Sequence, residues 1–343
     1  MPNVVCLSHR EDVDGLSSAI LIKAAFKAKR IILVDYSDLL CNIQKLIESL
    51  ASGEKERVFK RLFICDLGLS KKNERKFIDM LGKLISMGCT VTYIDHHDLC
   101  KDVEAALKRL GVALVHSSNE CTSILIYNKY KRKFKSHAAF FAAAGALTDY
   151  MENRPIASAI VSRFDRQFLM LQSTALSYMI SANQHNDEFL IQIVDTLSEM
   201  KYPHEIKGGF SIAERYAKKI SEAVRLIEQS ITKMNNLAYA PGTVDLSASM
   251  IVNFVLGASE KAVAMVYKLK EDINSFVISI RASKDCNVHL GRLVNHIATE
   301  VGGSGGGHEK ASGAVIPKDK LKEFIEILDA HISNHPDQYR MTH

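Results

Sequence analysis

The chain has 343 residues, 47% of them hydrophobic and 24% charged, which is enough to bury a substantial core and fits two domains better than one. Its net charge of +5 is mildly basic, so a polyanionic ligand is compatible with the composition but is not demanded by it.

Residues 1–120 alternate apolar runs of strand length with amphipathic helical stretches such as Gly15–Lys29 and Lys71–Met87. The runs are short, mostly aliphatic or β-branched, and buried in character on both faces. They predict strands at Val4–Ser8, Ile31–Tyr36, Leu62–Asp66, Thr90–Asp95 and Val112–His116. This rhythm predicts an α/β fold whose N-terminal domain (1–155) is a doubly wound, parallel, five-stranded sheet with right-handed crossovers.

The chain then reads as helical from about residue 120 to residue 235, punctuated by Pro155, Pro203 and Gly208-Gly209. We expect residues 156–236 to be a helical connector, whose apolar periodicity suits packing on the domains or a homo-oligomer interface.

Strand signals return from Leu237 and predict a smaller C-terminal α/β domain (237–343) with a mixed sheet. Its expected elements are strands at Ala262–Leu269, Phe276–Arg281 and Ala314–Ile316, a helix at Val288–Val301, a glycine-rich loop, and a final helix from Lys318.

Acidic and imidazole side chains gather where the expected N-terminal strands end. The first strand runs into Ser8–Gly15, the third ends at Asp66, and the fourth ends in Asp95-His96-His97. Ligands of open parallel sheets bind beyond the carboxyl ends of the strands. Carboxylates that converge there repel one another unless cations compensate, and a mixture of oxygen and imidazole ligands suits Mn²⁺.

Each of these acids also has an ordinary structural interpretation. Asp14-Gly15 has the form of a helix N-cap with its turn, and Asp66 is placed to cap a helix that begins near Ser70. Asp149, in the stretch GALTDY, reads by itself as a helix-surface acid. Asp95-His96-His97 is harder to explain in this way, because three ionisable residues directly after a buried strand are costly unless they serve a site.

The chain resembles the DHH phosphoesterase superfamily, of the RecJ-type exonuclease and nanoRNase-like kind. The N-terminal motifs that carry the resemblance are H-x-x-D-x-D-G at His9–Gly15, the strand-end Asp66, D-H-H at Asp95–His97, and Asp149. The C-terminal match is to the DHH-associated domain, in SIRASKD at Ser279–Asp285 and GGSGGGHEKASGA at Gly302–Ala314. Some relatives have a first motif one residue longer than this one, so the subfamily is not read from it.

The resemblance implies a site for two divalent ions, Mn²⁺ with Mg²⁺ or Co²⁺ as alternatives. The implied ligands are His9, Asp12 and Asp66 for one ion, and Asp14, Asp66, His96 and Asp149 for the other, so that Asp66 bridges the pair. Asp95 would fix the tautomer of a neighbouring histidine, and His97 would face the substrate phosphate.

In the C-terminal domain the resemblance implies that Arg281, Gly305, Gly306, Gly307 and His308 bind substrate, with Arg281 acting beside His97 and Asp95 in catalysis. Glycines let backbone N–H groups approach a phosphate closely, and an arginine fork suits phosphate oxygens. The residues alone also allow a flexible linker at Gly302–Gly307 and a surface salt bridge at Arg281.

The implied activity is phosphoester hydrolysis by water activated between two ions about 3.5–4 Å apart. We expect an exonuclease or oligoribonuclease that degrades short single-stranded RNA or DNA to mononucleotides. The alternatives are a phosphatase acting on a small nucleotide such as 3′-phosphoadenosine 5′-phosphate, a cyclic dinucleotide phosphodiesterase, an inorganic pyrophosphatase, and a non-catalytic subunit that binds nucleic acid. For that last function the basic stretch Lys129–His137 is the candidate surface, although a solvated helix end explains it equally well.

The seven cysteines form no C-x-x-C pair, which favours reduced core thiols over a disulfide framework or a zinc site. No leader-like segment and no apolar run of membrane-spanning length occurs. We therefore expect a cytoplasmic protein with no membrane partner.

Overall fold

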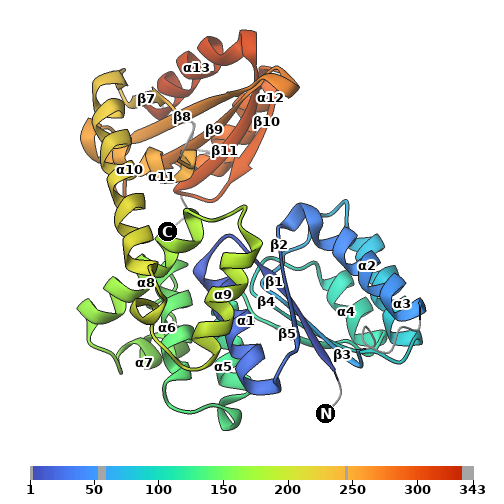
Figure 1. The fold of residues 1–343 in the computed structure, drawn as a ribbon. Helices are drawn as coiled ribbons and strands as arrows, with labels where there is room; N and C mark the ends of the chain where they lie inside the picture. The colour runs from blue at the N-terminus through green and yellow to red at the C-terminus, as the bar shows by residue number, and fades with distance from the viewer. Residues whose placement is uncertain (1–2, 53–58, 244–245, 334–343) are drawn as a thin grey trace. The chain divides into compact units, whose positions relative to one another are not determined.

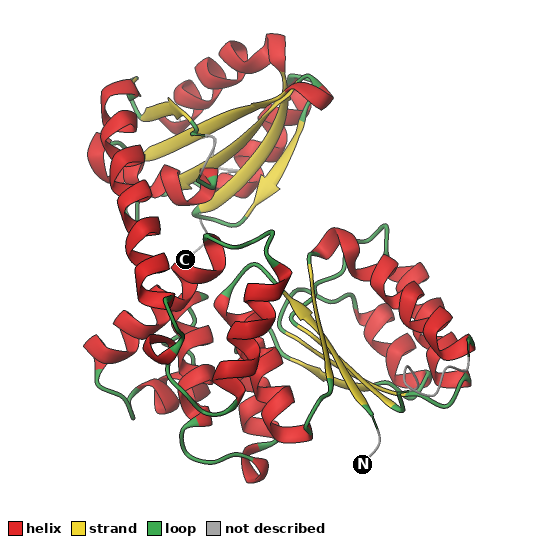
Figure 2. Cartoon of the chain, in the orientation of Figure 1, coloured by secondary structure: helices red, strands yellow, loops and turns green. Residues whose placement is uncertain are grey.

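The computed structural model describes residues 3–52, 59–243 and 246–333. These residues fall into two compact units, divided between Tyr216 and Ala217. The boundary lies within the helix α10 (Gly209–Ser230). The units are drawn together in Figures 1 and 2, with helices and strands distinguished by colour in the second.

The first unit contains a five-stranded sheet in the order β2-β1-β3-β4-β5, and all four strand pairs are parallel. The strands are β1 (Val4–His9), β2 (Arg30–Val34), β3 (Arg61–Cys65), β4 (Thr90–Asp95) and β5 (Ala113–His116). The parallel α/β fold predicted from the sequence is confirmed, and each strand lies within two residues of its expected bounds at both ends.

Helices cover both faces of this sheet, as a doubly wound fold requires. One core is formed with α2 (Leu39–Ala51), α3 (Glu74–Ser86) and α4 (Lys101–Arg109), whose apolar residues pack with Leu62, Ile64 and Tyr93. The other is formed with α1 (Val13–Phe26), α5 (Thr122–Lys129) and α6 (Ala138–Thr148), which pack against the opposite side chains of the same strands.

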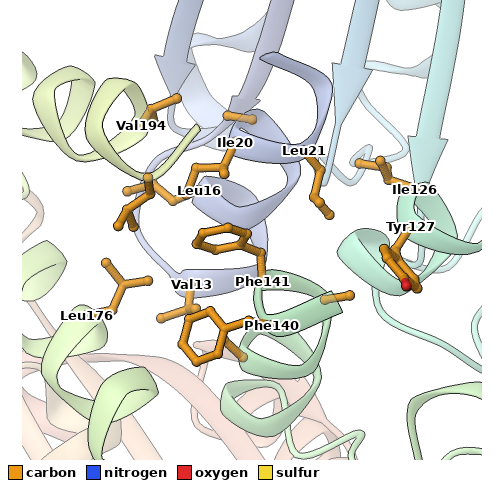
Figure 3. Close-up of a cluster of buried hydrophobic side chains, with 14 of the residues drawn as sticks. Val13, Leu16, Ile20, Leu21, Ile126, Tyr127, Phe140, Phe141, Leu176 and Val194 are labelled. Carbon is orange, nitrogen blue, oxygen red and sulfur yellow. The ribbon is translucent and has the colours of Figure 1, made fainter. Parts of the chain in front are cut away.

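Helix α1 is buried on every side along its first ten residues, which places the first motif at the centre of the unit. Figure 3 shows the reason: α1 presents Leu16 and Ile20 to a ring of helices that contribute Phe141 from α6, Leu176 from α8 and Val194 from α9. A helix that is apolar all round belongs in a core. The carboxylate at Asp14 is therefore held in a rigid, water-poor setting.

The helices α7 (Pro155–Val161), α8 (Arg166–Ser181) and α9 (Asp187–Ser198) share this second core with α1 and α6. Arg10, inside the first motif, forms an ion pair with Asp187 at the start of α9 (2.5 Å). The start of α9 thus contacts and stabilises the loop that carries the first motif. The division into domain, connector and domain at residues 155 and 236 remains a proposal.

The second unit holds a six-stranded sheet in the order β10-β11-β9-β8-β7-β6. Its strands are β6 (Thr232–Lys233), β7 (Leu237–Pro241), β8 (Val263–Lys270), β9 (Ser275–Ala282), β10 (Ser304–Gly307) and β11 (Ala311–Pro317). The pair β7–β8 is parallel and the others are antiparallel, so the predicted mixed sheet is confirmed. The described part of the unit also contains the C-terminal part of α10 and the helices α11 (Ala248–Ser259), α12 (Leu290–Glu300) and α13 (Leu321–Ser333). Short 3₁₀ turns occur in both units, at η1 (Tyr36–Asp38), η2 (Lys131–Lys133), η3 (Pro203–Glu205), η4 (Glu271–Ile273) and η5 (Lys318–Lys320).

The prediction of a glycine-rich loop in this unit is wrong for Gly305–Gly307, which lie in the edge strand β10. Gly307 has a φ of +149°, and a Cβ there would come within 2.4 Å of the Ala311 carbonyl oxygen. The start of α12 also presses on this strand, because a Cβ at Gly291 would lie 2.0 Å from the Gly307 oxygen. Glycine is used here for close backbone approach within a strand and not for flexibility.

The cysteines are free thiols, but the expectation that they are all core residues is wrong for Cys41 and Cys100, which are exposed. Both lie next to helix starts or on helix surfaces, where the sequence gives a lone cysteine no distinguishing mark. In the described residues, no helix is both long enough and apolar enough to cross a bilayer.

Candidate metal centre

The predicted site residues of the first unit come together at the carboxyl edge of the parallel sheet. His9 is the last residue of β1, Asp66 directly follows β3, and Asp95 is the last residue of β4. All three are at most 3% exposed. Parallel strands end on the same side, so three segments distant in sequence place polar groups around one buried point.

The first motif places its two acids differently. Asp12 is the N-cap of α1 and accepts a hydrogen bond from the Gly15 N–H (2.8 Å), while His9 Nε2 lies 3.4 Å from its other oxygen. The N-cap role weighed for Asp14 is thus filled by Asp12. Asp14 is fully buried and accepts hydrogen bonds from the backbone N–H groups of Thr122 (2.8 Å) and Ser123 (3.0 Å) and from the Ser123 hydroxyl. The start of α5 therefore fixes this carboxylate.

Asp66 does not cap a helix, because α3 begins only at Glu74 with Asn73 as its N-cap. Its backbone adopts the left-handed conformation (φ 57°), which aspartate tolerates better than most side chains. The carboxylate accepts a hydrogen bond from the Thr122 hydroxyl (2.9 Å) and is 3.4 Å from His96 Nε2. The tight turn after β3 thus holds this carboxylate toward the site.

His96 links the acids of three segments. Its Nε2 atom lies 3.4 Å from Asp66 Oδ1 and 3.6 Å from Asp149 Oδ2. Among the described residues, two sets of three side chains have possible ligand atoms within 4.8 Å of one another: Asp14, His96 and Asp149, and Asp66, His96 and His97. Asp149, the C-cap of α6, therefore faces the site and is not an isolated surface acid.

Asp95 orients His97. Its Oδ1 lies 2.9 Å from His97 Nδ1, and its Oδ2 accepts a hydrogen bond from the His97 backbone N–H (3.2 Å). The carboxylate is 1% exposed, whereas the His97 side chain is 34% exposed. A buried carboxylate at Nδ1 leaves Nε2 as the outward nitrogen of the ring.

Sequence reasoning missed two further residues at this edge, Tyr36 and His116. Tyr36 follows β2, stacks on His9 (ring centroids 4.4 Å apart) and brings its hydroxyl within 3.1 Å of His97 Nε2. His116 ends β5, and its Nε2 lies 2.6 Å from the His97 carbonyl oxygen. Polar residues at the carboxyl ends of parallel strands are expected at the site, as for Asp66 and Asp95. Tyr36 and His116 also stand at strand ends, so the same argument could have predicted them.

The electrostatics of the cluster favour bound cations. Burial, followed by the negative charges of Asp14 and Asp12, raises the pKa of Asp66 well above its ordinary value. The same causes raise the pKa of Asp149 to about 10. In the part of the chain that the structure describes, the ion pairs of these carboxylates are all with histidines. The negative charge therefore has no fixed positive partner.

These donors suit divalent ions. Carboxylate oxygens and imidazole nitrogens together form the ligand set of Mn²⁺ and related first-row metals, and cations remove the repulsion that raises the carboxyl pKa values. The clustered residues therefore fit a bound divalent metal, and the pair of ions that the family resemblance implied remains a proposal. The assignment of each residue to one ion or the other remains a proposal.

Three glycines allow the site to be this compact. A Cβ at Gly15 would lie 2.4 Å from the His9 carbonyl oxygen, and one at Gly68 would lie 2.9 Å from the His97 ring. At Gly145, in α6, a Cβ would come within 2.3 Å of Ser123 Oγ and 2.4 Å of Asp14 Oδ1. The first turn of α1, the turn after β3 and helix α6 thus approach the ligands without side chains between them.

We expect Gly145→Ala to displace Asp14, to destabilise the fold by about 1–3 kcal/mol and to weaken Mn²⁺ binding, because the added methyl overlaps the carboxylate. The measurements are urea unfolding and calorimetric Mn²⁺ titration. Gly82→Ala is the matched control, since Gly82 also lies within a helix and a Cβ there would meet only Leu110, at 3.6 Å. That variant is expected to retain Mn²⁺ affinity with stability equal or slightly higher. Equal metal affinity in both variants would contradict the role of Gly145.

The predicted substrate-binding residues of the C-terminal part lie together in the second unit. Arg281, on β9, pairs with Ala311 of β11, and β11 in turn pairs with Gly305–Gly307 of β10. His308 follows β10, is exposed, and donates its backbone N–H to the Ala311 carbonyl oxygen (2.7 Å). One end of this sheet thus carries all five residues, whose binding role remains a proposal.

Two family models match the chain. The DHH family N-terminal domain matches residues 3–152, and the DHHA1 domain matches residues 236–334. Two uncharacterized proteins of Methanocaldococcus jannaschii are similar in sequence. One is 30% identical over 180 residues (51% of this chain, 38% of that protein) and the other 42% identical over 150 residues (43% and 44%). The match thus spans less than half the length of these curated relatives.

Solved structures share the fold at low sequence identity. A pGpG-specific phosphodiesterase from Vibrio cholerae superposes with a TM-score of 0.60 at 13% identity, covering 97% of this chain and all of that one. RecJ from Thermus thermophilus, in complex with Mn²⁺, gives a TM-score of 0.61 at 13% identity, covering 99% of this chain and 53% of that one.

Proposed function

This chain belongs to the DHH phosphoesterase superfamily, and we propose that it is a metal-dependent phosphoester hydrolase whose chemistry takes place at the carboxyl edge of the first sheet. The observation that carries the proposal is the convergence of Asp14, Asp66, His96 and Asp149, because burial and mutual repulsion disfavour the ionised form of Asp66 and Asp149 and a bound cation would favour it. Such a concentration of acids is costly in a protein that does not bind metal there.

We propose that His9, Asp12, Asp14, Asp66, His96 and Asp149 hold two divalent ions, with Mn²⁺ as the preferred metal. When bound, these ions would supply Lewis-acid activation of water and neutralise charge on the phosphoryl oxygens. The chain itself orients His97 through Asp95, so that Nε2 faces outward where a phosphate oxygen would bind. Asp14, with three hydrogen-bond donors from Thr122 and Ser123, is fixed before any ligand arrives.

For the substrate, we propose a short single-stranded oligonucleotide cleaved to mononucleotides. Of the two solved structures named above, one is a pGpG-specific phosphodiesterase and the other is RecJ. Both superpose on nearly the whole of this chain. Arg281 and the β10 backbone offer donors suited to a second phosphate or a base. The runner-up is a phosphatase acting on a small bis-phosphorylated nucleotide, which the same donors also suit.

The alternative function of a non-catalytic subunit that binds nucleic acid depends on the basic stretch Lys129–His137, and the structure of this stretch argues against it. Its aromatic side chains are packed into the fold: Phe134 stacks on Tyr127 (5.7 Å), and Tyr130 meets Phe26 edge-on (4.9 Å). Stacking platforms for single strands need exposed aromatic faces. The interpretation of this stretch as a solvated helix end is therefore the better one.

The test is a product analysis under Mn²⁺. End-labelled short RNA, short DNA, pGpG, 3′-phosphoadenosine 5′-phosphate, a cyclic dinucleotide and pyrophosphate are compared with the full chain. We expect mononucleotide release from the oligonucleotides at the highest kcat/KM. Preferred turnover of the bis-phosphorylated nucleotide would favour the runner-up. If none of these substrates is hydrolysed while calorimetry demonstrates Mn²⁺ binding, the proposal that this protein is an enzyme is wrong.

A further inference from the structure

Tyr36 lies between two predicted site histidines that come from different strands. Its ring stacks on His9 with the centroids 4.4 Å apart and the planes inclined by 27°. It also meets the His97 ring edge-on, with centroids 5.6 Å apart, and its hydroxyl is 3.1 Å from His97 Nε2. One side chain from the turn after β2 thus spans the site edge from β1 to the segment after β4.

The hydroxyl of Tyr36 lies at hydrogen-bond distance from His97 Nε2, the ring nitrogen that would face a bound phosphate. Asp95 contacts Nδ1 of the His97 ring (2.9 Å), so Nε2 is the nitrogen turned to the open side. Tyr36 and His97 are 39% and 34% exposed, in contrast to the buried acids behind them. Because the two atoms are 3.1 Å apart, a ligand at His97 Nε2 has room to contact the Tyr36 hydroxyl as well.

The stacked ring has a second consequence, for His9. The Nδ1 atom of His9 has no hydrogen-bond partner in the described structure, so no second polar group fixes the plane of this imidazole. Contact with the flat face of Tyr36 restricts the ring instead. A metal-binding histidine is normally oriented by a hydrogen bond at its other nitrogen.

We propose that Tyr36 binds the substrate phosphoryl group through its hydroxyl, beside His97, and positions His9 through its ring. The proposal rests on the proposed function, because it places the phosphoryl group at His97 Nε2. In the absence of substrate the hydroxyl bonds to His97, and on binding it turns the same donor to a phosphoryl oxygen. No covalent step is involved.

Two variants separate the two roles. Tyr36→Phe removes only the hydroxyl, so the ring still stacks on His9. Tyr36→Leu removes both the hydroxyl and the aromatic face. Tyr178→Phe is the matched control, since Tyr178 belongs to the same unit and its ring packs on Tyr216, outside the metal centre.

Three quantities are measured on the full chain: calorimetric Mn²⁺ affinity, the Kd of inorganic phosphate for the Mn²⁺-loaded protein, and kcat/KM on a short oligonucleotide. We expect Tyr36→Phe to keep the Mn²⁺ affinity within about twofold while phosphate affinity and kcat/KM fall roughly 10- to 100-fold, as expected for one lost hydrogen bond to a charged oxygen. Tyr36→Leu is expected to weaken Mn²⁺ binding in addition, by about 10-fold or more. The control should match the wild-type chain in all three.

Each outcome decides a defined part of the proposal. Unchanged phosphate affinity in Tyr36→Phe overturns the phosphate contact, and unchanged Mn²⁺ affinity in Tyr36→Leu overturns the positioning of His9. If the wild-type chain hydrolyses none of the substrates, the proposed function fails. The two binding measurements still decide the role of Tyr36 in that case, because neither requires turnover.

Discussion

His96→Ala is expected to lower kcat/KM on the preferred substrate by on the order of 10³-fold or more, with the fold intact. His96 Nε2 is the atom that lies between Asp66 (3.4 Å) and Asp149 (3.6 Å), and it belongs to both sets of clustered ligand atoms. Losing it removes an imidazole nitrogen from both sets and leaves the carboxylates of Asp66 and Asp149 without the side chain that lies between them. Metal-dependent charge stabilisation is worth several kcal/mol in a transition state, and each 1.4 kcal/mol is a factor of ten.

The measurements are kcat/KM under saturating Mn²⁺, Mn²⁺ affinity by calorimetry, and circular dichroism with thermal melting to verify the fold. His96 is partly exposed and lies after the strand β4, so alanine leaves the core packing of β4 unchanged. His296→Ala, which removes a half-exposed histidine from α12 in the second unit, is the matched control. An active His96→Ala variant with unaltered Mn²⁺ affinity would contradict the assignment of His96 as a ligand.

The first sheet and most of its site are readable from the sequence for one physical reason. Short, β-branched or aliphatic runs that are apolar on both faces and alternate with amphipathic helices predict buried parallel strands, and parallel strands end at one edge. Polar residues at the ends of such runs, as at Asp66 and Asp95, are therefore predicted to converge although they lie 29 positions apart in the sequence. Nothing in the residues themselves, however, distinguishes Asp149 from a surface acid, because its position depends on how α6 packs.

The residues that escaped prediction are those whose role depends on tertiary contact. Tyr36 carries no charge and follows a strand in the way many loop aromatics do. The need for glycine at position 145 arises only because α6 presses against Asp14 of α1. In the same way, Gly305–Gly307 read as a loop because glycine is depleted in strands. Their pairing with β11 makes them a strand, and the close approach of α12 explains the need for glycine there.

Helix α11 and strand β7 show a further limit of sequence reasoning. The stretch Ala248–Ser259 is almost continuously apolar, so periodicity alone does not distinguish a buried helix from a strand. Strand β7 is five residues long and ends in a proline, which weakens its signal. The class of the second unit was nevertheless predictable, because β8, β9 and α12 have clear patterns of their own.

The metal-free protein is expected to lose stability as pH rises, and Asp149→Asn is expected to remove much of this loss. The pKa of Asp149 is raised from 3.8 to about 10 by burial and by the neighbouring charges of Asp14, Asp12 and Asp66. Between those two values the folded state binds more protons than the unfolded chain, so the free energy of unfolding falls with increasing pH. The amide in the Asp149→Asn variant carries no charge, and we expect this metal-free variant at pH 8 to be more stable by on the order of 2–3 kcal/mol, a rise in Tm of about 5–10 °C.

With Mn²⁺ added, we expect the wild-type protein to become more stable than Asp149→Asn. Bound cations compensate the carboxylates, so the wild-type Tm is expected to rise with added Mn²⁺, and to rise more at pH 8 than at pH 5, where protons compete for the ligands. Asp149→Asn has one carboxylate fewer in the proposed metal centre, so its Tm should rise little with added Mn²⁺. Asp79→Asn makes the same change of charge on the exposed surface of α3 and should behave as wild type under all conditions. If the stability of the metal-free wild-type protein is constant or increases from pH 5 to pH 8, this account is wrong. The account requires that repulsion among the buried carboxylates destabilises the metal-free site, and that a bound cation removes this repulsion.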